Sequence, residues 1–229
     1  MLNELKKQVF KANIDLVKHG LVLFTWGNVS GIDRENDLVV IKPSGVSYDT
    51  MKPSQMVVID LEGNIVEGDL KPSSDSETHV EIYKAFPEIG GIAHSHSTYA
   101  TAWAQAGKNI PVIGTTHADY FSQEIPCSTD LLSEQIEGSY EKETGKTIIE
   151  TLQGINIEHV PGVLVKNHGP FTWGKNANSA VFNSVVLEEV AKLAYLTFAI
   201  NPEAIMDIEL VRKHFERKHG KDAYYGQEN

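Results

Sequence analysis

Apolar side chains recur every three or four positions near the start of the chain, which is the spacing of an amphipathic helix. Residues 2–19 carry this pattern, and Gly20 follows as a natural end of the helix. The pattern then changes to short β-rich runs separated by turn-forming residues, so residues 28–67 predict antiparallel sheet. The inward positions of the helix are Leu5, Val9, Ala12, Leu16 and Val17, and the clearest runs of the sheet are 38–41 and 56–60.

The remainder of the chain alternates helical and strand-like patterns. A helix is expected to begin at Ser76 and to end at Phe86, because Pro87 cannot continue it. The other expected helices are 98–106, 133–152 with an interruption at Gly145, 178–200 and 207–219, and the expected strands are 91–96, 163–165 and 170–173. These elements predict an α/β fold in which a central, mostly antiparallel sheet is layered between helices, a three-layer αβα arrangement. In the helix 178–200 the inward positions are Val181, Val185, Leu187, Val190, Leu193 and Ala194.

Composition narrows the class of protein. A chain of 229 residues with 41% hydrophobic residues can bury a full core, and no linker-like stretch divides it, so one domain is expected. The formal net charge of −11 argues against a nucleic-acid partner and against an anionic membrane surface. With one cysteine and no apolar stretch of signal-peptide or membrane-spanning type, a cytoplasmic location is expected.

Two of the strand-like runs end on histidine. The first leads into His94-Ser95-His96, and residues two apart on an extended backbone face the same side. The second ends at His168, so two strand ends could converge on one site. Three neutral imidazoles with an open position suit a catalytic divalent ion such as zinc, whereas a polar strand edge is the alternative interpretation of the pair. With Cys127 as the only thiol, a Cys-rich structural zinc module is excluded.

Three loops, at 25–31, 42–45 and 71–75, are rich in small and hydroxyl-bearing residues that can surround a phosphate, and we call them the anion loops. The third of them precedes the helix at Ser76, whose N-terminus favours an anion, and Lys42 is a candidate charge partner. Such loops are also ordinary turns, and Asp75 is equally suited to cap the helix. The candidate substrate-binding residues are Gly27, Asn28, Lys42, Ser44, Gly45, Ser73 and Ser74.

Taken together, these motifs resemble the class II aldolase/epimerase superfamily in order and over nearly the whole chain. The motifs are Gly27-Asn28, Ser44-Gly45, Ser73-Ser74-Asp75, His94-Ser95-His96, Thr115-Thr116-His117-Ala118-Asp119-Tyr120 and Lys166-Asn167-His168-Gly169-Pro170. At the C-terminus, Arg217-Lys218-His219-Gly220 and Ala223-Tyr224-Tyr225-Gly226-Gln227 resemble the branch of L-ribulose-5-phosphate 4-epimerases.

The resemblance implies one class II aldolase/epimerase domain over residues 1–229 and a set of site residues. The expected cofactor is Zn²⁺ or another divalent ion such as Mn²⁺, and its expected ligands are His94, His96, His168 and Asp75. Related aldolases carry a glutamate at the position of Asp75, so the aspartate favours an epimerase. The expected acid/base groups are Asp119 and Tyr225. A homotetramer is also implied, in which Tyr225 serves the site of a neighbouring subunit, and the further site candidates are Thr115, Glu141, His214 and Arg217.

The implied reaction inverts C4 of L-ribulose 5-phosphate to give D-xylulose 5-phosphate, as in arabinose catabolism. The hydrogen on C4 is not next to the C2 carbonyl and is not acidic, so inversion is expected to proceed by retro-aldol cleavage and re-addition through an enediolate. The alternatives are a sugar-phosphate class II aldolase, a related dehydratase, and a non-catalytic binding module like the head domain of adducin.

Overall fold

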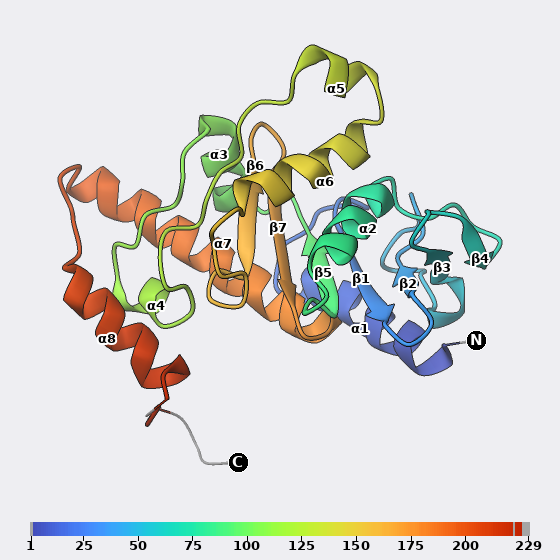
Figure 1. The fold of residues 1–229 in the computed structure, drawn as a ribbon, viewed down its shortest axis with the longest axis horizontal. Helices are drawn as coiled ribbons and strands as arrows, with labels where there is room; N and C mark the ends of the chain where they lie inside the picture. The colour runs from blue at the N-terminus through green and yellow to red at the C-terminus, as the bar shows by residue number, and fades with distance from the viewer. Residues whose placement is uncertain (1, 222, 226–229) are drawn as a thin grey trace.

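A computed structural model describes residues 2–221 and 223–225 and contains, within them, one antiparallel sheet of seven strands (Figure 1). The strands are β1 (Asn28–Asp33), β2 (Leu38–Ile41), β3 (Val57–Asp60), β4 (Ile65–Glu67), β5 (Gly91–His94), β6 (Gly162–Val165) and β7 (Gly169–Gly174). Their order is β4-β3-β2-β1-β5-β7-β6, which places the histidine-bearing β5 between β1 and β7. Gly226 and Gln227 of the C-terminal motif lie outside the described residues.

Helices cover both faces of the sheet, which confirms the predicted αβα layering. The helices are α1 (Asn3–Lys18), η1 (Pro53–Gln55), α2 (Ser76–Ala85), α3 (Thr98–Ala106), α4 (Thr115–Ala118), α5 (Ser133–Glu137), α6 (Tyr140–Thr151), α7 (Ala177–Ile200) and α8 (Ile208–His219). α2 and α6 pack on one face, and α1 and α7 pack on the other. In the described part of the chain, no helix combines the length and the apolar character needed to cross a membrane.

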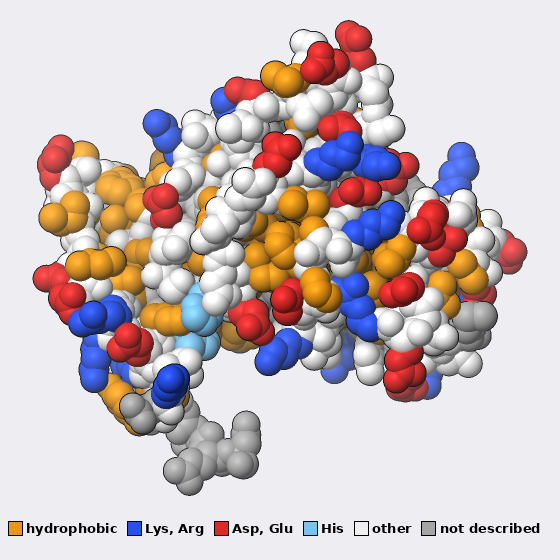
Figure 2. All heavy atoms as spheres, viewed as in Figure 1, with side chains coloured by type: hydrophobic (Ala, Val, Ile, Leu, Met, Phe, Trp, Pro, Cys, Tyr) orange, Lys and Arg blue, Asp and Glu red, His pale blue; other side chains and the backbone are white. Residues whose placement is uncertain are grey.

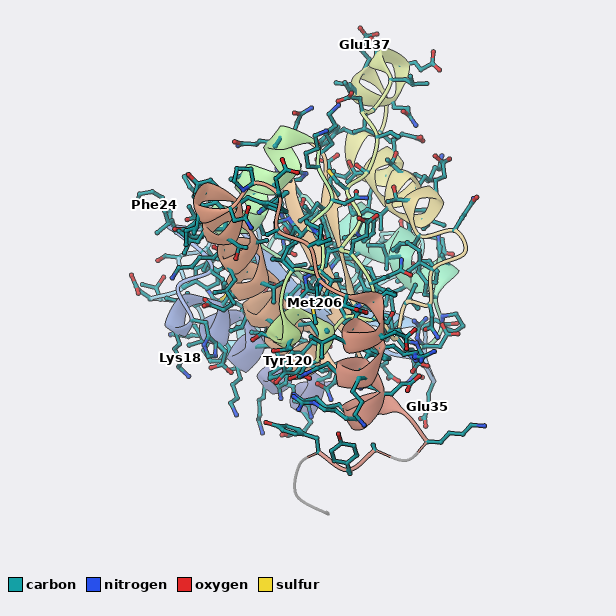
Figure 3. The ribbon with its side chains drawn as sticks, turned by 90° about the vertical axis from the view of Figure 1, so that its left-hand side faces the viewer. Lys18, Phe24, Glu35, Tyr120, Glu137 and Met206 are labelled. Carbon is teal, nitrogen blue, oxygen red and sulfur yellow. The ribbon has the colours of Figure 1, made fainter. Side chains whose placement is uncertain are left out.

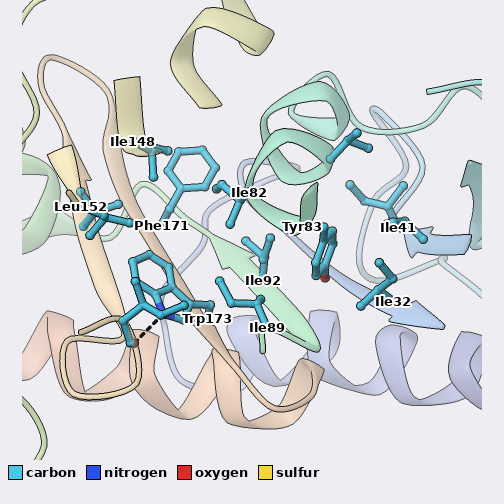
Figure 4. Packing of buried hydrophobic residues seen from close by; sticks show 14 of the residues in the cluster. Ile32, Ile41, Ile82, Tyr83, Ile89, Ile92, Ile148, Leu152, Phe171 and Trp173 are labelled. Atoms are coloured by element: carbon cyan, nitrogen blue, oxygen red, sulfur yellow. Dashed lines mark hydrogen bonds between the residues drawn. The ribbon is translucent and has the colours of Figure 1, made fainter. Parts of the chain in front are cut away.

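The alternation of side chains along the strands explains why both faces are buried. In β3, Val57 and Ile59 join the core under α2 and α6, whereas Val58 joins the core under α1. Figure 4 shows the first of these cores, where Tyr83 of α2 packs near Ile92 of β5. Both faces are thus apolar, with one cluster under α2 and α6 and two on the side of α1 and α7. Burial of both faces fixes the register of the strands that carry the site.

Several details of the sequence prediction are wrong. Gly145 does not interrupt a helix: it lies inside α6, and the break falls at Gly138 between α5 and α6. A Cβ at position 145 would lie 2.7 Å from the Cβ of Glu81, so this glycine allows α6 to approach α2 closely. The side chains of Val17 and Leu193 were expected to face inward but are 40% and 43% exposed.

Candidate metal and anion site

The three predicted metal ligands lie together at one end of the sheet. His94 is the last residue of β5, and its Nδ1 lies 3.0 Å from the carbonyl oxygen of Pro170. The Nε2 atoms of His94 and His96 are 3.1 Å apart, and the ring of His168 is 4.7 Å from that of His94 and 5.0 Å from that of His96. Because the ring centres of His94 and His96 are 5.0 Å apart as well, the three rings form a nearly equilateral triangle, and the predicted convergence is confirmed.

Two glycines let neighbouring segments of the chain approach the end of β5 closely. Gly27 has φ +84°, and a Cβ there would lie 2.7 Å from the carbonyl oxygen of His94. A Cβ at Gly169 would lie 2.7 Å from the carbonyl oxygen of Ser95. Any larger residue at either position would push the backbone away from the histidines.

A constrained turn between β6 and β7 presents His168. Asn167 precedes it with φ +63°, a left-handed conformation that asparagine tolerates better than most residues. The carboxylate of Asp130 accepts hydrogen bonds from the side chains of Lys166 and Asn167, which ties the turn to the neighbouring loop. On the ring itself, Nδ1 lies 3.4 Å from the hydroxyl of Tyr140.

Desolvation favours the neutral imidazoles of His96 and His168, and the neutral form is the one that binds a metal. Desolvation lowers the pKa of His168 to about 3, and the positive charge that His94 would carry acts in the same direction. Desolvation also lowers the pKa of His96 below its ordinary value. The lone pairs of these two rings are therefore available at neutral pH.

The donor set fits a divalent ion. A tetrahedral ion about 2.1 Å from two imidazole nitrogens holds them about 3.4 Å apart, close to the observed separation of the two Nε2 atoms. One nitrogen from each of the three histidines falls within a group whose members all lie within 4.8 Å of one another. Because Nδ1 of His94 faces a carbonyl, its Nε2 is left free for a metal, which is a common outer-sphere arrangement.

Asp75 lines the same cavity but is not a member of that close group. Its Oδ2 accepts a hydrogen bond of 2.6 Å from the side chain of Asn28. Burial alone would raise the pKa of Asp75, but the adjacent histidines, His94 foremost, and the amide of Asn28 bring it below its ordinary value. The carboxylate is thus held ionised beside the triad, and its role as a ligand stays a prediction.

One cavity of about 320 Å³ joins the histidines to the predicted anion loops. Its lining includes every predicted substrate-binding and metal-ligating residue: Gly27, Asn28, Lys42, Ser44, Gly45, Ser73, Ser74, Asp75, His94, His96 and His168. Two of the loops are joined by backbone hydrogen bonds, from Ser44 N to the Lys71 oxygen and from Ser73 N to the Lys42 oxygen, both 2.9 Å long. The cavity therefore has a histidine end and a hydroxyl-rich end.

Lys42 supplies the positive charge at the hydroxyl-rich end. Its side chain is buried, and Nζ donates a hydrogen bond of 3.2 Å to the carbonyl of Pro43. Desolvation lowers the pKa of Lys42 to about 8. Among the residues that the structure describes, no ion pair involves this ammonium group, so an anion in the cavity would be its natural partner.

The two predicted acid/base residues are not in this cavity. Asp119 follows α4, and its carboxylate is held by Arg217 of α8 through contacts of 2.8–3.1 Å and by Nδ1 of His214 at 3.0 Å. Burial opposes ionisation of Asp119, but the bonds from Arg217 bring its pKa below the ordinary value. The ring of Tyr225 lies against α8 as well, 4.6 Å from the guanidinium carbon of Arg217 and 4.6 Å from Nζ of Lys218.

This second cluster lies at the opposite end of the sheet. Tyr120 and His219, which adjoin Asp119, line a hollow with Ile89 and Gly174, and Gly174 pairs with Gly91 at the start of β5. The histidine triad lies at the other end of β5, three residues on, which is about 10 Å along the strand. Figure 3 places Tyr120 beside α8, and Figure 2 shows the hollow next to that helix. A single subunit therefore does not bring Asp119 to the triad.

The remaining sequence candidates divide in the same way. His214 and Arg217 belong to the α8 cluster, whereas Thr115 is exposed at the start of α4. Glu141 lies in α6, and its carbonyl oxygen accepts a hydrogen bond from the hydroxyl of Thr78. None of these four residues lines the cavity of the triad.

Sequence reasoning missed three aromatic residues at the site. Trp26 lines the cavity, with its ring 6.4 Å from that of His96, and Tyr140 approaches His168. Tyr48 lies behind the cavity wall, where its hydroxyl donates to the carbonyl of Gly27. The position of Trp26 beside Gly27 was a usable signal, but nothing near Tyr48 or Tyr140 in the sequence marks them.

A family comparison identifies the chain. The model of the "Class II Aldolase and Adducin N-terminal domain" matches residues 7–195. The chain belongs to this family. Class II aldolases use a divalent metal, which agrees with the histidine triad. The expected aldolase/epimerase resemblance is thereby confirmed at the level of the family, and the epimerase branch stays a prediction.

Solved structures show the same fold. An L-fuculose 1-phosphate aldolase is 28% identical, with a TM-score of 0.79, and the match covers 93% of this chain and 95% of that one. The L-fuculose 1-phosphate aldolase from Glaciozyma antarctica PI12 is 23% identical with a TM-score of 0.77, covering 96% of this chain and 84% of that one. The l-fuculose-1-phosphate aldolase from Thermus thermophilus is 22% identical with a TM-score of 0.70, covering 89% of this chain and 100% of that one. All three show the fold, and the 28% identical aldolase supports enzyme status within the family.

Proposed function

We propose that this protein epimerises L-ribulose 5-phosphate at C4 to give D-xylulose 5-phosphate. The observation that carries the proposal is the single cavity that joins three clustered imidazoles to a buried lysine and hydroxyl-rich loops. Such a cavity suits a small sugar that has a phosphate at one end and a ketose group at the other. The C-terminal motif around Tyr225 favours the epimerase over other members of the family.

The two ends of the cavity would have different roles, phosphate binding at one and bond cleavage at the other. Lys42, Ser44 and Ser73 would hold the phosphate at the hydroxyl-rich end. The C3–C4 bond would then break at the histidine end, giving glycolaldehyde phosphate and the enediolate of the remaining three carbons. Because the phosphate stays bound, the aldehyde can rotate and present its other face, and re-formation of the C3–C4 bond inverts C4.

The triad is the proposed position of the divalent cofactor, Zn²⁺ or Mn²⁺, with His94, His96 and His168 as ligands and Asp75 as a further one. When bound, the ion would supply positive charge that stabilises the enediolate. Asn28 holds the carboxylate of Asp75 in place through its 2.6 Å hydrogen bond. That bond leaves the other carboxylate oxygen of Asp75 available to the cavity.

Asp119 and Tyr225 are the proposed acid/base pair, one for each face of the aldehyde. Since they lie at the other end of the sheet in their own subunit, they would have to act in the site of a neighbouring subunit. Contacts of this head-to-tail kind close into rings, so a cyclic homotetramer is proposed. The cationic side chains around Tyr225 would favour its phenolate during proton transfer.

The second candidate is a sugar-phosphate aldolase, favoured by the 28% identity to an L-fuculose 1-phosphate aldolase. An aldolase would use the same metal and anion ends of the cavity but would release the aldehyde. Asp75 argues for the epimerase, since related aldolases carry a longer glutamate there. A non-catalytic module like that of adducin would have no use for an open imidazole triad.

The test is conversion of L-ribulose 5-phosphate by metal-loaded protein, followed by NMR, with a chelated sample as the control. We expect D-xylulose 5-phosphate to appear only in the metal-loaded sample. Free glycolaldehyde phosphate as the main product would identify an aldolase instead. Absence of turnover with this sugar would contradict the proposal, and turnover of another ketose phosphate would then redirect it.

A further inference from the structure

Tyr48 joins two walls of the cavity without lining it. It is 6% exposed, and its hydroxyl donates a hydrogen bond of 2.8 Å to the carbonyl oxygen of Gly27. The same hydroxyl lies 3.3 Å from the carbonyl oxygen of Trp26. The face of its ring lies 4.8 Å from Nζ of Lys42. One side chain therefore contacts both the loop at 25–28 and the lysine of the opposite wall.

We expect the position of the loop at 25–28 to depend on its contact with Tyr48. The other two anion loops hold each other through backbone hydrogen bonds between Ser44 and Lys71 and between Ser73 and Lys42. The loop at 25–28 leads into β1, whose first residue Asn28 pairs with His94. Two side-chain contacts tie the loop to the other walls of the cavity, from Asn28 to Asp75 and from Tyr48 to the carbonyl of Gly27. Phe24, which precedes this loop, is 79% exposed, and its ring packs edge-on against that of Trp26 (Figure 3).

The ring of Tyr48 has a separate effect on Lys42. A buried ammonium group with no carboxylate partner is held by what surrounds it, and the face of an aromatic ring attracts a cation electrostatically. Nζ donates to the carbonyl of Pro43, so the remaining N–H groups are free to bind a ligand in the cavity. The ring thus favours the charged lysine in the position where an anion would meet it.

We propose that Tyr48 is a positioning residue for anion binding, acting through its hydroxyl on the 25–28 loop and through its ring on Lys42. This inference rests on the proposed function only in taking the cavity to bind a phosphate. Burial raises the pKa of Tyr48 well above its ordinary value, so its hydroxyl stays a donor at every pH at which the protein would be assayed. A site held in its binding geometry before the ligand arrives gains affinity.

Two substitutions separate the two contacts. Tyr48→Phe removes the hydroxyl and keeps the ring, whereas Tyr48→Leu removes both. Inorganic phosphate is the probe, titrated into the metal-loaded protein by calorimetry. We expect the dissociation constant to rise about three- to tenfold in Tyr48→Phe, the range for one lost hydrogen bond, and further in Tyr48→Leu. Bound metal, measured by elemental analysis, should be unchanged, because Tyr48 contacts no histidine of the triad.

Tyr83→Phe is the matched control. Tyr83 is buried as well, and its hydroxyl lies 2.8 Å from that of Ser30 in β1, but among the described residues no hydrogen bond joins it to residues 25–28, 42–45 or 71–75. This variant should lose comparable stability and bind phosphate as the wild type does. In turnover of the sugar phosphate, Tyr48→Phe should raise KM with kcat within about twofold, which loss of stability alone would not produce.

The outcomes separate two kinds of failure. Phosphate affinity in Tyr48→Phe equal to that of the wild type would overturn the role of the hydroxyl. Equal affinity in Tyr48→Leu would overturn the role of the ring as well. If the wild type itself bound no phosphate, the anion end of the cavity and with it the proposed function would be wrong, whatever the variants did.

Discussion

The protonation state of Lys42 should depend on whether an anion is bound in the cavity. Water is excluded from its ammonium group, which is why its pKa falls from the ordinary 10.5 to about 8. A bound phosphate would supply a negative charge to this group, which forms no ion pair within residues 2–221 and 223–225. Protonation of Lys42 and binding of an anion should therefore favour each other.

The binding of a phosphate monoester is predicted to weaken above pH 8. The second pKa of such an ester is about 6, so its own charge is constant between pH 8 and 10. In that range the free protein loses the proton of Lys42, and binding requires its return, which costs about a factor of ten in affinity per pH unit. Calorimetric titrations from pH 7 to 10 would measure this. Lys42→Met should bind weakly with no such slope, and an affinity that is equal at pH 7 and 9.5 in the wild type would contradict the linkage.

The N-terminus of α3 is capped by the carboxylate of Glu188, a residue far away in the sequence. Glu188 of α7 accepts hydrogen bonds of 2.9 Å from the amides of Tyr99 and Ala100, the second and third residues of the helix. The side chain of Ser97, at the N-cap, makes no capping bond. Because His96 directly precedes this start, Glu188 also limits where the second ligand of the triad can lie.

Replacement of Glu188 by alanine is predicted to lower the free energy of unfolding by about 1–3 kcal/mol, because two buried amides lose their acceptor. Glu188→Gln should lose roughly half as much, since one acceptor oxygen remains. Glu189→Ala is the control, because that neighbouring side chain is exposed, and its effect should stay within about 0.5 kcal/mol. Denaturant unfolding gives the stabilities, and competition with a chelator gives the zinc affinity, which should fall only in the Glu188 variants. If Glu188→Ala and Glu189→Ala changed the stability and the zinc affinity equally, Glu188 would not act as the N-terminal cap of α3.

The accuracy of the sequence prediction differed between kinds of element. The helix at 98–106 and the strand at 38–41 were predicted at their observed bounds, because short periodic runs with clear end signals fix them. Gly145 was misread because a single sequence does not show that a glycine faces a neighbouring helix. The convergence of the triad followed from local pattern, since each histidine ends a strand-like run. Tyr48 was not found, because its contacts depend on how separate loops fold together.

The sequence prediction did not show that the catalytic candidates lie far from the triad. Asp119 and the triad belong to one set of motifs along the chain, yet the structure separates them by the length of a strand. Sequence order carries no information on which end of a sheet a loop occupies. The protein is acidic, with a formal charge of −11, but Lys and Arg side chains gather on α8 (Figure 2). A basic helix of this kind on an acidic protein suits contact with an acidic surface of another copy.

Subunit complementation would test whether one active site draws on two copies. One variant, His96→Asn, would lose the metal end, and the other, Asp119→Asn with Tyr225→Phe, would lose the proposed acid/base pair. Each alone should be inactive. In a co-expressed mixture, a site is intact when both its contributing subunits supply the undamaged half, so random assembly in a ring should restore about one quarter of wild-type activity.

The same mixture also tests the alternative that each active site is built from one subunit. If each subunit folded its own Asp119 and Tyr225 onto its own triad, every site would carry one defect and the mixture would be no more active than its parents. Size-exclusion chromatography with light scattering must show that the mixed oligomers form, and the metal content of the Asp119 and Tyr225 variant must match the wild type. Restored activity with both controls met would place the acid/base pair across a subunit boundary, as the separation of the two clusters in one chain predicts.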